Sequence, residues 1–373
     1  PRMNAAPWRW ISLGLLAVQA ARGSRAATLP EAAAAAANRV RDDGFLLAAD
    51  RSGVYVVAAR ERGVLYGAYE ILKRYGGVRW LMPGPEGEVC PKRPIVSVPA
   101  QVTLANPSMR LRRFNLVCGG ARDDTFAWLL RNNMQVSGRW ETRGMAKFAP
   151  WVQAGGHIFS TLLPDALFDT RPDLFGLYKG VRTPQSGRLD IEPGKHQLGG
   201  QANQPCTSNP ETVRIMQENL LKLVARTPRV ESFCILNNDS GSWCECETCR
   251  KLDPPEEQRR GFVSTRYWTL VNQLVAAGKK EFPRLDFGVA AYQTFQEPPV
   301  GIVPDPRVSV DFCLHHRCYL HSIGDERCGV NRRYRDILAR WHALKLPVST
   351  YEYTDILPRG EVIYLPLEKI VAD

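Results

Sequence analysis

The stretch Val230–Cys249 reads VESFCILNNDSGSWCECETC and carries the clearest structural signal in the chain. Its first part, Val230–Ile235, is an apolar run with the composition of a buried strand, and polar Asn238 and Asp239 follow closely. In α/β proteins, functional side chains usually lie at the carboxyl ends of strands. The stretch therefore predicts a strand with candidate functional residues at its end, although an Asn/Asp/Gly/Ser turn with structural cysteines has the same composition.

Short apolar runs and amphipathic helical segments alternate on both sides of this stretch. The expected strands are 111–117, 232–236, 285–292, 308–314 and 347–353, and the expected helices are 124–131, 210–225, 264–282 and 331–344. Such alternation indicates βαβ units and a parallel sheet. The number of units favours an α/β fold of the (β/α)8 TIM-barrel type over residues 107–373. No Gly-x-Gly-x-x-Gly or phosphate-loop motif supports nucleotide binding.

Two further regions precede the expected barrel. Residues 28–106 predict a small α/β domain, with strands at 45–49 and 54–59 and a helix at 63–75 that Gly76 and Gly77 end. Residues 1–27 predict a signal peptide, because two arginines precede a short apolar run and small residues follow. That run is too short for a stable membrane anchor. We therefore expect a periplasmic or secreted protein without stable membrane insertion.

The distribution of charged residues indicates which classes of partner the protein could bind. The formal net charge is +11, and it falls to +7 without the four arginines of residues 1–27. The remaining basic residues are scattered and form no long tract with interleaved aromatics, so we expect no nucleic-acid partner. A positive cleft for an acidic substrate, such as a uronic acid, explains the charge at least as well as nucleic-acid binding, and a solvated basic surface is the commonest explanation.

Several ordered motifs resemble known families. The run Arg62–Leu72, followed by Gly77–Gly84, looks like the small domain that precedes the catalytic barrel of bacterial alpha-glucuronidases and beta-hexosaminidases. Later motifs resemble a related bacterial family, the domain-of-unknown-function family numbered 4838. These motifs are Pro107–Arg110, Gly155–Phe159, Cys206–Pro210, Asn238–Asp239 with the Trp-Cys-x-Cys-x-x-Cys that follows, and Tyr351–Tyr353.

This resemblance covers roughly Gly44 to Leu365 and implies a glycosidase-like barrel that acts on oligosaccharides or polysaccharides. Two departures from the family pattern stand out. An Ala-rich segment replaces the usual start of the small domain upstream of Gly44. The chain also ends soon after the strand expected at 347–353, which would be the seventh strand of a family-like barrel, so we expect a barrel truncated before its last strand, as in a piece of a longer reading frame.

Glycoside hydrolysis normally uses two carboxyl groups that flank the glycosidic bond. Asp239 is the predicted general acid, because the resembling hydrolases keep their acid after the corresponding strand; an Asx-turn is the alternative. Glu352 is the predicted base or nucleophile, because those families supply a carboxylate at the corresponding strand end. Asp311 faces away from its apolar neighbours in the strand, so it is either catalytic or a core hydrogen-bonding group. Glu297 is a reserve candidate.

Polar and aromatic residues near the expected strand ends are candidates for sugar contacts. Arg317 suits a bidentate clamp on a uronate carboxylate, and His157 suits a sugar hydroxyl or carboxylate. Aromatic rings such as Tyr319 are candidate stacking platforms, although rings at strand ends are more often part of a core. The predicted substrate-binding set is His157, Asn238, Trp243, Tyr292, His315, His316 and Arg317.

The chain contains ten cysteines, and export would permit disulfides. Cys244, Cys246 and Cys249 have the spacing of a metal knuckle, and Cys206 is the candidate fourth ligand. Structural zinc and disulfides remain equal alternatives for these four. The favoured disulfide elsewhere is Cys318–Cys328, which flanks a short polar loop. We predict no catalytic cofactor.

The sequence thus favours an exported glycoside hydrolase-like protein that acts on glycans containing uronic acids or amino sugars. A non-catalytic glycan-binding protein on a degenerate hydrolase barrel is the main alternative. A metal-dependent hydrolase that uses the cysteine cluster and histidines is a third hypothesis, which chelation of the metal would test.

Overall fold

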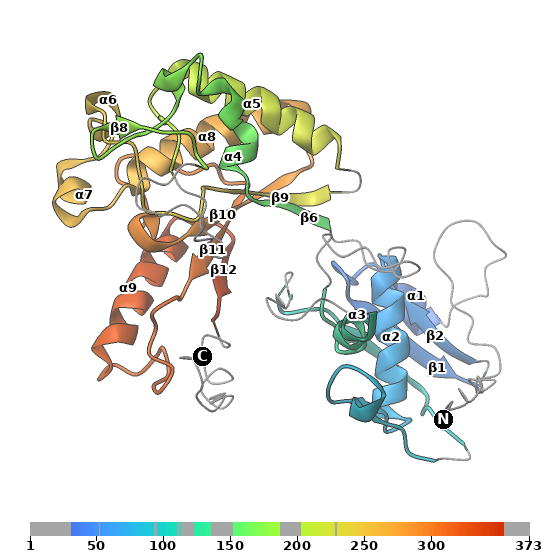
Figure 1. Ribbon diagram of the computed structural model, residues 1–373. Coiled ribbons are helices and arrows are strands. Elements are labelled where there is room, and N and C mark those ends of the chain that lie inside the picture. The colour runs from blue at the N-terminus through green and yellow to red at the C-terminus, as the bar shows by residue number, and fades with distance from the viewer. Residues whose placement is uncertain are drawn as a thin grey trace, which may run out of the picture. The chain divides into compact units, whose positions relative to one another are not determined.

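A computed structural model describes residues 31–51, 53–92, 95–109, 112, 123–135, 152–186, 203–227 and 230–353 (Figure 1). They belong to two compact units, Pro1–Trp151 and Val152–Asp373. The predicted signal peptide, Cys118 and most of the predicted strand 111–117 lie outside the described residues. Among the described helices, none has the length and apolar character needed to cross a bilayer.

The first unit is built on a three-stranded antiparallel sheet in the order β2-β1-β5. Its strands are β1 (Phe45–Asp50), β2 (Gly53–Val57) and β5 (Gln101–Ala105), and its helices include α1 (Glu31–Ala37) and α2 (Glu61–Arg74). The central strand is apolar and buried from Phe45 to Ala49 because both of its faces are covered there. Phe45 and Leu47 join the core around α2, whereas Leu46 and Ala48 pack with Ala33 of α1.

Helix α3 (Asp123–Arg131) also belongs to the first unit. Its Phe126 lies in the same core as Phe45, and its Trp128 donates a 3.0 Å hydrogen bond from Nε1 to the Trp80 carbonyl. Arg112 bonds to the buried carboxylate of Asp43 at 3.0 Å. These contacts extend the first unit past residue 106, where the sequence analysis placed its end.

The second unit contains a five-stranded parallel sheet in the order β12-β11-β10-β9-β6. Its strands are β6 (Val152–His157), β9 (Val230–Leu236), β10 (Asp286–Ala291), β11 (Val308–Cys313) and β12 (Val348–Tyr351). Sheet strands that follow one another in the chain lie side by side, and among the described strands of this unit only the short β7 and β8 lie outside the sheet. The predicted parallel sheet is confirmed, while the described strands on their own do not close into a barrel.

Strand β6 was not among the predicted strands, because its residues Gly155 and Gly156 are poor strand formers. Gly155 has a φ of +88°, and a Cβ atom there would lie 2.1 Å from the carbonyl oxygen of Cys234. The glycine therefore lets β6 approach β9 closely.

Three long helices of this unit confirm the predicted segments: α5 (Pro210–Ala225), α8 (Ser264–Glu281) and α9 (Gly329–Ala343). Helix α5 begins at Pro210, and the Asn209 side chain caps it by accepting a 2.9 Å bond from the Glu211 backbone N–H. Phe287 and Val310 of the sheet share one core with Trp268 of α8 and Trp341 of α9. Burial of each such side chain contributes about 1.5–3 kcal/mol, so this face of the sheet anchors the unit.

Short elements complete the chain. They are β3 (Arg79–Trp80), η1 (Pro85–Gly87), β4 (Glu88–Val89), α4 (Phe159–Leu162), η3 (Asp165–Leu167), η4 (Pro172–Leu174), β7 (Leu177–Tyr178), β8 (Val181–Arg182), α6 (Glu247–Arg250), α7 (Pro255–Arg260) and η5 (Gln293–Phe295).

Candidate functional site

The carboxyl ends of neighbouring strands bring several predicted residues together. Asp239 follows β9 and is exposed, Tyr292 follows β10, His315 follows β11 and Glu352 follows β12. The His315 ring meets Tyr292 edge-on, with a centroid distance of 5.6 Å. The negative charge of Asp239 acts on both Tyr292 and His315. These residues therefore form one cluster at the edge where a parallel sheet normally carries its chemistry.

A short chain of contacts joins His315 to Glu352. The His315 ring lies 4.7 Å from the ring of Tyr353, measured between centroids. The backbone N–H of Tyr353 donates to the hydroxyl of Tyr319 at 2.9 Å, and that hydroxyl donates to Oε2 of Glu352 at 3.4 Å. Burial comes first among the causes that raise the pKa of Tyr319 to about 12. Its hydroxyl therefore keeps its proton and remains a donor to Glu352 near neutral pH.

Arg317 holds the other oxygen of Glu352. Its Nη1 lies 3.2 Å from Oε1, and its guanidinium lies over the Tyr319 ring at 4.9 Å. The Arg317 side chain is 1% exposed, whereas that of Glu352 is 26% exposed. The predicted role of Arg317 as a bidentate clamp on a uronate does not fit this position, because the arginine is buried and pairs with the Glu352 carboxylate.

The two histidines after β11 differ in exposure. His315 is half-buried, His316 is exposed, and Nδ1 of His315 lies 2.9 Å from Nε2 of His316. Burial, followed by the neighbouring His316, lowers the pKa of His315, while the charge of Asp239 opposes the shift. His315 is therefore neutral at pH 7 and can donate or accept a hydrogen bond.

A pocket of about 650 Å³ adjoins these histidines. His315 and His316 line it together with Gln293, Arg260 and Arg333. Neither Asp239 nor Glu352 is among its lining residues. The pocket therefore shares the histidines with the carboxylate cluster and adds basic groups beside it.

Asn238 has a different role from the predicted sugar contact. Its side chain is fully buried, donates to Oε1 of Gln185 and to the carbonyl of Asn203, both at 2.7 Å, and accepts from the N–H of Ser160. The Gln204 side chain bonds to the Asn238 backbone twice. Its Nε2 donates to the Asn238 carbonyl, and its Oε1 accepts from the Asn238 N–H. Asn238 therefore fixes the loop that presents Asp239.

Trp243 is not the predicted stacking platform. It is 5% exposed and packs edge-on against Tyr267 and Phe295, both with centroid distances of 5.8 Å. His157 ends β6 at an exposed position, with Nδ1 2.5 Å from the carbonyl of Asn237. The sheet edge therefore offers His157 to solvent while Trp243 belongs to the core.

The other two candidate carboxylates make structural contacts. Asp311 accepts a hydrogen bond from the Ser349 hydroxyl across the β11–β12 pair, which fits the core alternative. Burial alone would raise the pKa of Glu297, but bonds from Arg260 and Arg340 outweigh it and lower the pKa. Glu297 is thus an ion-paired group that anchors α7 and α9.

The structure brings the four predicted metal-ligand cysteines together. The sulfur atoms of Cys206, Cys244, Cys246 and Cys249 all lie within 4.8 Å of one another. The favoured Cys318–Cys328 disulfide is not formed, since both are free thiols, and the Sγ of Cys318 lies 3.2 Å from Nδ1 of His321.

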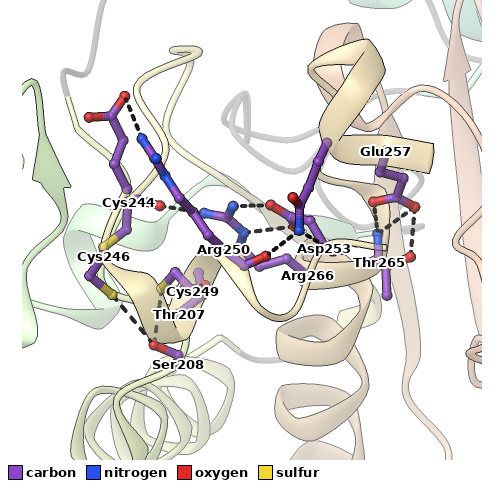
Figure 2. Close-up of polar contacts among 12 residues, drawn as sticks. Thr207, Ser208, Cys244, Cys246, Cys249, Arg250, Asp253, Glu257, Thr265 and Arg266 are labelled. Carbon is purple, nitrogen blue, oxygen red and sulfur yellow. Dashed lines mark hydrogen bonds and ion pairs between the residues drawn. The ribbon is translucent and has the colours of Figure 1, made fainter. Parts of the chain in front are cut away.

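A buried ion pair fastens the cysteine loop to α8 (Figure 2). Arg266 pairs with Asp253, and both side chains are 5% exposed or less. The same guanidinium donates a 2.5 Å hydrogen bond to the carbonyl of Cys244. Next to it, the carboxylate of Glu257 accepts a bond from the Thr265 backbone N–H at 3.0 Å.

Sequence reasoning missed several supporting residues. Gln185, Asn203 and Gln204 form the amide network around Asn238, and Tyr353 links His315 to Tyr319. The signal for part of this network was the Asn203-Gln204 pair just ahead of the quoted Cys206 motif. Its partners come from distant segments, which a single sequence does not reveal.

Comparison with known proteins agrees with the motifs. Residues 82–362 match the family model described as "Domain of unknown function (DUF4838)", and residues 16–71 match "Glycosyl hydrolase family 67 N-terminus". Both matches confirm the resemblance, and the second relates residues 16–71 to the N-terminus of a glycosyl hydrolase family. The second match begins upstream of Gly44, so the expectation that the small domain lacks its start there is wrong.

A solved structure, the beta-N-acetylhexosaminidase from Bacteroides fragilis NCTC 9343, is similar at 10% sequence identity with a TM-score of 0.40. The similarity covers 85% of this chain and 62% of that chain. None of the curated proteins compared with the chain matches it.

Proposed function

The chain belongs to the DUF4838 family, and from this premise we propose that it is a glycoside hydrolase in which Asp239 is the general acid and Glu352 the base or nucleophile. The observation that carries the proposal is the setting of Glu352. It is a partly exposed carboxylate at the end of β12, held by a buried arginine and a tyrosine hydroxyl. A carboxylate so placed is oriented toward the edge that Asp239 also occupies.

The two carboxyl groups have environments that suit different tasks. The Arg317 guanidinium donates to Glu352 at 3.2 Å and orients a carboxylate that stays partly exposed, as a base or nucleophile requires. Asp239 has no ion pair among the described contacts and stands exposed at the end of β9. As the acid, it would protonate the glycosidic oxygen while Glu352 activates water or attacks the anomeric carbon.

Aromatic and histidine side chains between the carboxylates support a sugar-binding role. Tyr292 and Tyr353 flank the neutral His315 edge-on. Such rings offer apolar faces to the CH groups of a sugar ring, and the histidine offers a hydrogen bond to a hydroxyl. Asn238 and Arg317 would act as positioning residues for Asp239 and Glu352.

The pocket beside His316 supports an acidic substrate. Arg260 and Arg333 line it together with the two histidines. A uronate carboxylate bound there would be attracted by the arginines, of which Arg333 comes from α9. We therefore propose glycans that contain uronic acids as the first substrate class, with amino-sugar glycans as the second.

The strand order also supports a barrel. All five strands of the parallel sheet run in chain order without reversal, as in a singly wound (β/α) barrel rather than a doubly wound sheet. We propose that the sheet is part of a (β/α)8-type barrel. The arginines and the apolar run within residues 1–27 support export to the periplasm or the cell exterior.

Sugar release from a panel of aryl glycosides and uronate-capped oligosaccharides tests the proposal. The Glu352→Gln variant should lower turnover by about 10²–10⁴-fold, the range of acid–base catalysis, while the thermal midpoint stays within a few degrees. The matched control is Glu281→Gln, an exposed residue at the end of α8, which should retain full turnover.

Two outcomes would overturn the proposal. Full turnover in Glu352→Gln would remove Glu352 from the chemistry. No release from any substrate by folded protein, together with saturable binding of the same glycans that persists in Glu352→Gln, would replace hydrolysis with glycan binding.

A further inference from the structure

The geometry of the four clustered cysteines points to a structural zinc site, and we propose that Cys206, Cys244, Cys246 and Cys249 bind one Zn²⁺ ion as thiolates. Cys206 precedes α5, whereas the other three lie in the loop that follows β9 and in α6. All four sulfur atoms lie within 4.8 Å of one another. This proposal does not depend on the proposed hydrolase activity.

The sulfur–sulfur distances favour a metal over disulfides. The Sγ atom of Cys206 lies 3.8 Å from that of Cys246 and 3.8 Å from that of Cys249. A tetrahedron with Zn–S bonds of about 2.3 Å has edges of about 3.8 Å. A disulfide has an S–S length of about 2.05 Å, so two disulfides would need the loop to rearrange. These two distances thus match the edge of a tetrahedral thiolate site, and all four sulfur atoms lie within 4.8 Å of one another.

The ligand set is complete and closed. Cys249 is 0%, Cys244 1% and Cys206 4% exposed, and only Cys246 is partly exposed. Four protein ligands leave no open position for water or substrate, which is the pattern of a structural zinc site rather than a catalytic one. The hypothesis of a metal-dependent hydrolase that uses this cluster therefore has no support in the geometry.

Hydrogen-bond donors surround the sulfur atoms, as around metal thiolates. The backbone N–H of Leu177 donates to the Sγ of Cys244 at 3.3 Å. The hydroxyl oxygen of Ser208 lies 3.1 Å from the Sγ of Cys249 and 3.8 Å from that of Cys246 (Figure 2). Such outer contacts orient the ligands and stabilise their negative charge.

Two guanidinium groups offset the charge of the site. Four thiolates around Zn²⁺ carry a net charge of −2. Arg182 and Arg266 both interact electrostatically with the cluster, Arg182 through Cys206 and Arg266 through Cys249. Arg266 also donates to the carbonyl of Cys244. The two cations therefore offset part of the negative charge of the buried centre, since Arg266 is also paired with Asp253.

The ion would join segments that are far apart in the chain. The cluster links β7, the segment before α5 and the loop after β9. The same loop begins at Asn238, whose backbone and side chain bond to Gln204 and Asn203, two to three residues before Cys206. Zinc at the cluster would therefore fix both ends of the loop that carries Asp239.

The test is metal content combined with thiol state in the purified full-length protein, prepared without chelators. Elemental analysis should find one zinc per chain in the wild type, and loss of that zinc in Cys246→Ser, which alters the least buried ligand. Two matched controls, Cys90→Ser in the first unit and Cys318→Ser in the loop after β11, should retain it.

A second measurement keeps the proposal falsifiable if Cys246→Ser does not fold. Replacing zinc with Co²⁺ in the wild type should produce the intense visible absorption of tetrahedral cobalt thiolate, and a chelator should abolish it and speed proteolysis between residues 203 and 250.

Three results would contradict the site. One is metal-free protein whose non-reduced mass lacks four hydrogens, which means two disulfides. Another is a protein with four free cluster thiols that takes up neither zinc nor cobalt. The third is zinc that stays bound in a folded Cys246→Ser variant and is lost in Cys318→Ser.

Discussion

Two loops at the same edge of the parallel sheet are built in opposite ways. Side chains of the loop after β9 are largely buried: Asn238 is fully buried, two of the loop's three cysteines, Cys244 and Cys249, are buried, and Arg266 fastens the loop to α8. The loop after β11 is open: His316 is exposed, and the Arg327 side chain is 91% exposed. Both loops nevertheless contribute to one cluster of candidate catalytic residues.

The two loops thus hold their candidate catalytic carboxylates in place in different ways. In the loop after β9, the acid candidate Asp239 is the exposed residue on a buried frame. In the loop after β11, the buried residue Arg317 is the fixed point, and it holds the carboxylate of Glu352, which follows β12. The first loop therefore depends on its frame for stability, whereas the second depends on one ion pair for the geometry of Glu352.

The largest expected effect on stability concerns the buried contacts that hold the loop after β9. Arg266→Met leaves the buried Asp253 carboxylate and the Cys244 carbonyl without their partner. Loss of one member of a buried pair should lower the free energy of unfolding by about 3–5 kcal/mol, measured by denaturant titration. Arg327→Met, which removes an exposed pair with Asp325, is the matched control and should leave the free energy of unfolding unchanged. If both variants lowered the free energy of unfolding equally, the loop after β9 would not depend on its buried contacts more than the loop after β11 does.

Arg317, in the loop after β11, should affect turnover more than the stability of the fold. Arg317→Met removes the Nη1 contact that orients Glu352. We expect turnover to fall about 100-fold, the scale of a misplaced catalytic group, with a smaller change in KM. Steady-state kinetics on the best glycoside of the panel measures this. A variant with unchanged turnover would show that Arg317 does not position Glu352.

A smaller effect is expected at the amide network. Asn238→Ala leaves the Gln185 side-chain oxygen and the Asn203 carbonyl without their donor. Unmet hydrogen bonds of buried groups should lower the free energy of unfolding by about 1–3 kcal/mol. If Asn238 instead contacts sugar, this variant would keep its stability and lose glycan affinity.

The smallest effect is a pH dependence in the open loop. The pKa of His315 is lower in the folded protein than its ordinary value of 6.5, so the unfolded chain binds more protons just below pH 6.5. Because of His315, stability therefore decreases as the pH is lowered through that region. Denaturant titrations between pH 7.5 and 5.0 should show a shallower fall in His315→Gln than in the wild type. A steeper fall in the variant would contradict the sign.

Much of the fold was predictable because it depends on local patterns. The apolar runs that became β9 to β12 and the amphipathic segments that became α5, α8 and α9 have periodicities that match their structures. Strand β6 was missed because its two glycines allow close backbone packing, a tertiary reason that composition does not reveal. The end of the first unit was placed too early because the packing of α3 is likewise tertiary.

The site was predictable in its location and less so in its roles. Asp239, His315 and Glu352 lie at strand ends, as their positions in the sequence indicated. Arg317, Asn238 and Trp243 lie there too, but each side chain is turned inward to a carboxylate, an amide network or a core. Residue type and strand-end position do not specify that direction.

The dependence of Asp239→Asn turnover on the leaving group tests the central claim most directly. An acid is needed to expel a poor leaving group and is dispensable for an aryl group that departs as a stable anion. We predict that Asp239→Asn loses about 100-fold or more in turnover on a glycoside with a poor leaving group and little on one with a strongly acidic phenol. Equal losses on both substrates, or none on either, would contradict the assignment of Asp239 as the general acid.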